Sequence, residues 1–148
     1  MQAIGDDLAG VTNSEETLGR VVRYFAADSG TIHFLGDDGL LHLAATTETF
    51  PEPVMAAIRT IPVGKGMAGL AVERRMPVDS CNIQTDQSGD VRPGARATAM
   101  GGAIVVPIFR GDAVVGALGI ANRADRVFSE AEVQDLLTAA RIVGERSA

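Results

Sequence analysis

Two neighbouring apolar runs in the C-terminal half constrain the fold of this chain more than any other feature. They are "GGAIVVPIF" at 101–109 and "AVVGALGIANR" at 113–123, and the turn "RGD" separates them. Each run is apolar at successive positions and not only at alternate ones, so both of its faces need cover. Two strands joined by so short a turn pair antiparallel. The sequence therefore predicts a central antiparallel hairpin with helices packed over it.

An amphipathic helix is predicted near each end of the chain. Asn13 and Glu16 can form a capping box at the start of the first helix, and Ser129 and Glu132 supply the same pattern for the second. Apolar residues follow each box at helical spacing. They are Leu18, Val21, Val22 and Phe25 in the first helix, and Val133, Leu136, Leu137, Ala140 and Val143 in the second.

The middle of the chain is predicted to hold a second hairpin and several short elements. "TIHFL" at 31–35 and "LLHLAATT" at 40–47 flank the turn "GDDG" and read as paired strands. "FPEPVMAAIRT" at 50–60 and "MAGLAVERR" at 67–75 suggest short helices, and "MPVDS" at 76–80 a short strand. Hairpins with helices at both ends predict an α+β fold, with one domain over residues 1–148.

Composition excludes several classes of function. With 148 residues, 46% of them hydrophobic and 22% charged, the chain has the balance of a globular protein. Its net charge of −6 argues against non-specific binding to nucleic acid. The apolar runs are too short to span a bilayer, and the N-terminus lacks a basic region before an apolar core. We therefore expect a cytoplasmic protein with no nucleic-acid or membrane partner.

The stretch "SCNIQTDQSGDVRPGARATAM" at 80–100 is the least regular part of the chain and contains its single cysteine. A nucleophilic Cys81 would need a histidine base close to it, and the two histidines of the sequence are His33 and His42. Each histidine alternates with apolar neighbours in a predicted strand, so the simpler reading is a semi-buried cysteine and two solvent-facing histidines. No pair of residues has a recognised metal-ligand spacing, so no metal site is expected.

Two arginines are the most suggestive residues of this stretch. A guanidinium offers a planar fork that suits carboxylates and phosphates. Arg92 and Arg96 therefore either point into a pocket and fix an anionic ligand, or pair on the surface with Asp86 or Asp90. The sequence leaves both roles open.

Several weak motifs occur in an order that resembles one family. Gly64, Gly66 and Gly69 open a short helix, and Arg96 precedes the "VPI" strand at 106–108. The strand segment "VGAL" at 115–118 follows, and "FSEAE" at 128–132 begins the closing helix. In this order the residues resemble the GAF domain family, and the upstream helix and hairpin suit the same order. The resemblance covers essentially the whole chain.

The resemblance implies a GAF/PAS-like fold: a central antiparallel sheet of five or six strands, terminal helices on one face, and short helices and loops over a pocket on the other. Such domains usually sense a small molecule, and many form homodimers through their terminal helices. Here the implied ligand-binding residues lie in the irregular stretch, and the ligand or cofactor itself is unknown. They are Cys81, Asn82, Asp86, Arg92, Arg96 and Thr98.

Departures from the family's patterns narrow the function. The motif of cyclic-nucleotide-binding members is matched only in part, by Asn122, Arg123, Phe128 and Glu132. Asn82, and not histidine, follows the cysteine, unlike in bilin-binding members. The branch that reduces free methionine sulfoxide uses several cysteines, and this chain has one. We expect a non-enzymatic sensory domain; the alternatives are a reductase-like thiol enzyme using Cys81 and a ligand-free dimerisation module.

Overall fold

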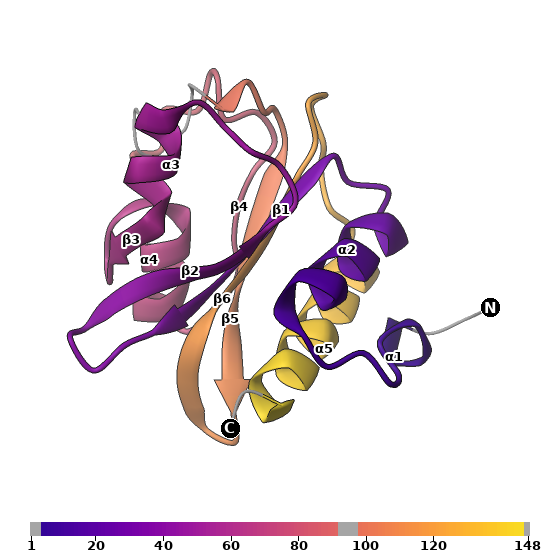
Figure 1. Cartoon of the computed structure of the whole chain (residues 1–148). Coiled ribbons are helices and arrows are strands. Elements are labelled where there is room, and N and C mark those ends of the chain that lie inside the picture. The colour runs from indigo at the N-terminus through magenta and orange to yellow at the C-terminus, as the bar shows by residue number, and fades with distance from the viewer. Residues whose placement is uncertain (1–3, 92–97, 147–148) are drawn as a thin grey trace.

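The computed structural model describes residues 4–91 and 98–146, and six strands in this part of the chain form one antiparallel sheet (Figure 1). Their order across the sheet is β3-β2-β1-β6-β5-β4. The predicted α+β fold with an antiparallel sheet is confirmed. The strands are β1 (Ser29–Leu35), β2 (Leu40–Thr46), β3 (Thr60–Pro62), β4 (Val78–Ser80), β5 (Ala103–Arg110) and β6 (Ala113–Ala121).

Helices lie on both faces of the sheet, and those near the termini share one face (Figure 1). There α2 (Ser14–Tyr24) and α5 (Glu130–Arg146) pack side by side, and the short α1 (Ile4–Asp7) lies against α5. On the other face lie α3 (Glu52–Arg59) and α4 (Gly66–Arg74). No helix among the described residues is both long and apolar enough to cross a membrane.

Capping fixes where the two longer helices begin, as predicted. The Asn13 side chain accepts a 2.7 Å hydrogen bond from the Glu16 backbone N–H. At the other helix the Ser129 hydroxyl accepts from the Glu132 N–H at 3.1 Å, and the Glu132 carboxylate accepts from the Ser129 N–H at 2.9 Å. This reciprocal pair satisfies backbone donors that a helix otherwise leaves free. The helix α1 has only four residues and was not predicted.

The face of the sheet covered by α2 and α5 holds the larger hydrophobic core. Apolar residues of α2 and α5 are buried there against the even-numbered residues of β1, β5 and β6. These helix faces are therefore buried within the chain itself, and do not by themselves support the predicted homodimer. The fully buried members are Leu8, Leu18, Val21, Ile32, Val106, Ile108, Leu118 and Ala139.

A bulge in β2 makes this strand contribute to both faces of the sheet. Ile32 pairs with Ala45 and His33 with Leu43, which leaves Ala44 as the extra residue. Ala45 therefore packs in the core on the face covered by α2 and α5, whereas Leu41 packs on the opposite face, in the cluster beside α4. Two residues four positions apart thus face opposite ways, which strict alternation would not allow.

The central strands approach each other very closely at one glycine. Gly116 in β6 pairs with Phe34 in β1 and Ile108 in β5. A Cβ atom at this position would collide with the backbone carbonyl oxygen of His33. The glycine at this position therefore allows the two backbones to pack closely.

Candidate functional site

A small cavity of about 170 Å³ lies between the sheet and the elements that cover its second face. The odd-numbered residues of β1 form part of its floor, and residues of β5 and β6 continue that floor. Side chains from α3, α4 and the segment after β4 form the walls and roof. The described lining residues include Ser29, Thr31, His33, Phe50, Ile58, Ile61, Met67, Ala68, Ile83, Thr98, Met100, Ala103 and Val105.

His33 is the most unusual residue of this cavity. Its side chain is buried, with the residue only 2% exposed. Nε2 lies 2.7 Å from the carbonyl oxygen of Ile58 in α3. Because a carbonyl can only accept, Nε2 carries the hydrogen and Nδ1 is left as an acceptor. Nδ1 is buried and has no hydrogen-bond partner in the described structure.

Burial determines the charge of this histidine. Removal from water lowers the pKa of His33, and the hydrogen bond to the Ile58 carbonyl opposes that shift only in part. His33 is the one ionisable side chain among the described residues that line the cavity. The imidazole is therefore neutral near pH 7, and it leaves one buried, unpaired nitrogen in mostly apolar surroundings.

The remaining polar side chains of the described lining are those of Ser29, Thr31 and Thr98, and two of them contact Met100. The Ser29 hydroxyl, also buried, lies 3.7 Å from the Met100 sulfur. The Thr98 hydroxyl accepts from the Met100 N–H at 3.2 Å. Met67 and Met100 themselves line the cavity, and methionine side chains adapt their shape readily. The cavity thus combines a deformable apolar wall with a few fixed polar atoms.

The segment after β4 is held against α4 and against the residues just before β5. Arg74 makes a bidentate pair with the Asp90 carboxylate, with N–O distances of 2.9 and 3.1 Å. The Ile83 N–H donates to Gly101 O at 2.8 Å, and the Gln84 amide donates to Met100 O at 2.9 Å. Ile83 is buried as a result and reaches the cavity.

The structure separates the predicted site residues. Thr98 lines the cavity, whereas Cys81, Asn82 and Asp86 are not among its described lining residues. Cys81 is exposed, so the expectation of a semi-buried cysteine was wrong. The Asn82 amide donates to Asp125 at 2.7 Å, and the Asp86 carboxylate accepts from the Ser80 hydroxyl at 2.7 Å. Their role as ligand contacts stays a prediction.

Arg92 and Arg96 lie outside the described residues, so their two alternative roles stay predictions too. One of the partners named for them is engaged elsewhere, since Asp90 pairs with Arg74. The expectation of two solvent-facing histidines holds for His42, whose imidazole is half exposed beside Asp38. It was wrong for His33, because α3 covers the face of the sheet to which this residue points.

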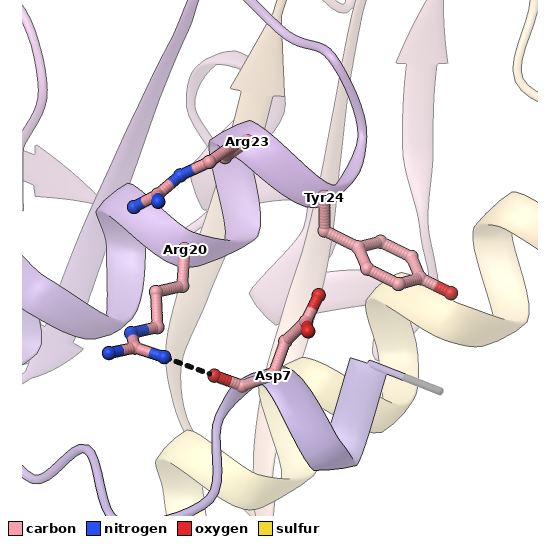
Figure 2. A pocket seen from close by; sticks show the side chains of 4 residues that line it. All are labelled: Asp7, Arg20, Arg23 and Tyr24. Carbon is pink, nitrogen blue, oxygen red and sulfur yellow. Dashed lines mark hydrogen bonds between the residues drawn. The ribbon is translucent and has the colours of Figure 1, made fainter. Parts of the chain in front are cut away.

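A second hollow, wider and more polar, lies between α1 and α2 (Figure 2). It measures about 350 Å³ and is lined by Asp7, Arg20, Arg23 and Tyr24. Arg20 donates to the Asp7 backbone carbonyl at 3.1 Å, and the Tyr24 hydroxyl donates to Asp135 at 3.0 Å. That hydrogen bond raises the pKa of Tyr24. This hollow is lined by charged and polar side chains, and the mostly apolar pocket around His33 is the better candidate site.

The sequence matches the model of one protein family. The model described as "GAF domain" matches residues 13–145, which is most of the chain. The chain is a GAF domain. No curated protein matches the sequence.

Solved structures agree with this assignment at the level of the fold. The GAF domain of a phosphoenolpyruvate-protein phosphotransferase from Coxiella burnetii has a TM-score of 0.78 and 21% identity, and the match covers 97% of this chain and 87% of that one. A free methionine-R-sulfoxide reductase from Neisseria meningitidis, solved with its substrate, has a TM-score of 0.78 and 21% identity. This match covers 97% of this chain and 83% of that one.

A third similar structure comes from a signalling protein. A domain of a two-component sensor histidine kinase from Sinorhizobium meliloti has a TM-score of 0.69 at 16% identity, and the match covers 86% of this chain and 83% of that one. Enzymes and signalling domains therefore both share the fold of this GAF domain, and the fold alone does not determine its function.

Proposed function

We propose that this GAF domain binds a small molecule in the cavity around His33 and acts as a sensory module. The observation that carries the proposal is a mostly apolar pocket between the sheet and the helices α3 and α4, with the buried, neutral His33 in its lining. Apolar surface in contact with water gains free energy when an apolar ligand group covers it, so this pocket favours an occupant.

The covering elements support a sensory role. The pocket is lined by α3, by α4 and by the segment after β4, and these contribute Ile58, Ala68 and Ile83. A ligand that contacts all three covering elements stabilises their positions relative to the sheet. Occupancy then changes the outer surface of the domain, which a partner or a neighbouring domain can read.

A ligand retained on purification tests this proposal directly. We expect native mass spectrometry of the freshly purified protein to show an added mass that is lost on denaturation. Ala68→Leu places three further carbon atoms at the cavity wall, and we expect the added mass to disappear. The matched control is Ala57→Leu on α3, because Ala57 is exposed and does not line the cavity. Equal retention in both variants would place the ligand elsewhere.

A thiol-dependent reductase is the enzymatic alternative. The free methionine-R-sulfoxide reductase from Neisseria meningitidis is similar in fold, and this similarity is the argument for the enzymatic alternative. Cys81 is exposed and does not line the cavity, and the sequence has no second cysteine to resolve a sulfenic acid. We infer that the chain is not a reductase. Methionine sulfoxide reduction by the wild type that is lost in Cys81→Ser would overturn this inference.

Homodimerisation through the terminal helices is a further part of the proposal. The apolar faces of α2 and α5 are already used in the core, so a dimer would rely on the outward surfaces of these helices. Tyr24, paired with Asp135, lies on that side together with the groove of Figure 2. Sedimentation velocity across a range of concentrations measures the oligomeric state, and a monomer at every concentration would remove this part.

A further inference from the structure

The aromatic ring of Phe109 contacts two arginines that come from opposite faces of the sheet. Phe109 lies near the end of β5, beyond residues 103–105, with which β4 pairs. The guanidinium carbon of Arg75 lies 5.2 Å from the centre of the ring, and that of Arg141 lies 5.5 Å from it. Both distances are in the range of a cation–π contact. One ring at the end of the sheet thus contacts a side chain from each helical layer.

On the face that holds the pocket around His33, Arg75 attaches the end of α4 to the β5–β6 hairpin. Arg75 is the C-cap of α4, and its guanidinium donates a 2.7 Å hydrogen bond to the carbonyl oxygen of Asp112 in the hairpin turn. The same helix carries Met67 and Ala68, which line the pocket. Because a regular helix of nine residues moves as a unit, an occupant that displaces α4 also displaces Arg75.

On the opposite face, the C-terminal half of α5 packs against the same end of β5. Arg141 donates to the Gly111 carbonyl at 3.4 Å. A Cβ atom at Gly144 would collide with the carbonyl oxygen of Phe109, and Arg110 donates to the Gly144 carbonyl at 3.1 Å. Packing this close leaves no free space between α5 and the strand, so a displacement of this end of β5 displaces the helix as well.

We propose that Phe109, together with Arg75 and Arg141, couples the pocket around His33 to the C-terminal half of α5. The sheet separates α4 from α5, which lie on opposite faces (Figure 1), and the ring of Phe109 connects them. This inference rests on the proposed function and names the route by which occupancy reaches the other face of the domain. A partner that reads the state of the pocket therefore binds at α5.

Amide hydrogen exchange in α5 tests the coupling, because it measures local opening. Arg75→Gln changes a residue outside α5, and we expect amides of residues 139–144 to exchange about two- to fivefold faster relative to those of α2. This is the change that loss of one exposed cation–π contact produces. Arg74→Gln is the matched control, because it removes the same charge from the neighbouring residue, which pairs with Asp90 instead. The exchange ratio should not change in the control.

Two further variants connect this ratio to the ring and to the pocket. In Phe109→Leu the ring is absent, so adding Arg75→Gln should not change the ratio further. Ala68→Leu imitates an occupant, because it adds three carbon atoms to α4 at the pocket wall. We expect Ala68→Leu to change the ratio at least twofold when Phe109 is present, and to leave it unchanged in Phe109→Leu.

The outcomes separate this inference from the function on which it rests. Equal ratios in Arg75→Gln and Arg74→Gln would show that the ring does not couple α4 to α5, and both arginines are exposed, so this comparison holds even if Phe109→Leu does not fold. An effect of Arg75→Gln or Ala68→Leu that persists in Phe109→Leu would also overturn the inference. None of these measurements needs a ligand, whereas the proposed function fails if native mass spectrometry finds no retained molecule.

Discussion

Acidification tests the environment of His33 most directly. Burial lowers the pKa of this imidazole from its ordinary value of 6.5, because the cationic form loses its hydration and no described lining residue carries a compensating negative charge. The unfolded chain therefore binds a proton at higher pH than the folded chain does. Stability is fully present above pH 6.5 and falls as pH decreases from there toward the folded pKa.

The size of the effect follows from linkage. Between the unfolded and the folded pKa, each pH unit removes about 1.4 kcal/mol of unfolding free energy for one proton. For a domain of this length, that lowers Tm by about 3–6 °C per pH unit. The lowered pKa values of Asp38 and Glu132 also reduce stability as pH falls, but at more acidic pH, because these carboxyls lose their contribution only below about pH 4.5. The window from pH 7.5 to 5 therefore isolates the histidine.

Urea unfolding followed by circular dichroism at several pH values measures this slope. In His33→Gln the Nε2 amide of glutamine can still donate to the Ile58 carbonyl, but nothing titrates, so we expect a nearly flat profile. His42→Gln is the matched control, because His42 is exposed, and it should keep the wild-type slope. A wild-type profile that is flat from pH 7.5 to 5, or an unchanged slope in His33→Gln, would refute the reasoning.

Three further substitutions test the fold. Gly116→Ala forces a methyl group against the His33 carbonyl and should destabilise the protein by more than about 2 kcal/mol in urea unfolding. Gly19 lies in α2, and no atom lies within 4 Å of a methyl group added there, so Gly19→Ala should stabilise the protein by up to about 1 kcal/mol. A loss of stability in this variant would contradict the helical conformation of Gly19. Ser129→Ala removes the cap of α5 and should cost about 1 kcal/mol, whereas the exposed Thr138→Ala should stay within about 0.5 kcal/mol of wild type.

Periodicity and capping predicted most of the fold because both depend on residues close together in the sequence. The capping residues Asn13 and Ser129 and the two hairpins were recognised from such local patterns. The four-residue α1 is too short to show a period. The bulge at Ala44 was missed as well, because an unpaired residue in β2 depends on the neighbouring strand and leaves no mark in the sequence of β2 itself.

The candidate site was harder to predict because it depends on what covers the sheet. His33 alternates with Ile32 and Phe34, and this pattern predicts a solvent-facing histidine. The alternation is real, since Ile32 and Phe34 pack on the face covered by α2 and α5. The opposite face is covered too, so the alternate residue is buried. The covered central hairpin was a signal that both faces have partners, and it could have pointed to a buried histidine.

The hydrogen bond between His33 and Ile58 has a consequence for how the domain responds to acid. Nε2 donates to the Ile58 carbonyl whether the ring is neutral or cationic, so protonation leaves α3 attached to the central strand. The proton adds at Nδ1, and the atom that accepts hydrogen bonds at neutral pH becomes a donor. Acid therefore adds a buried positive charge that no described lining residue compensates, without releasing the helix above it.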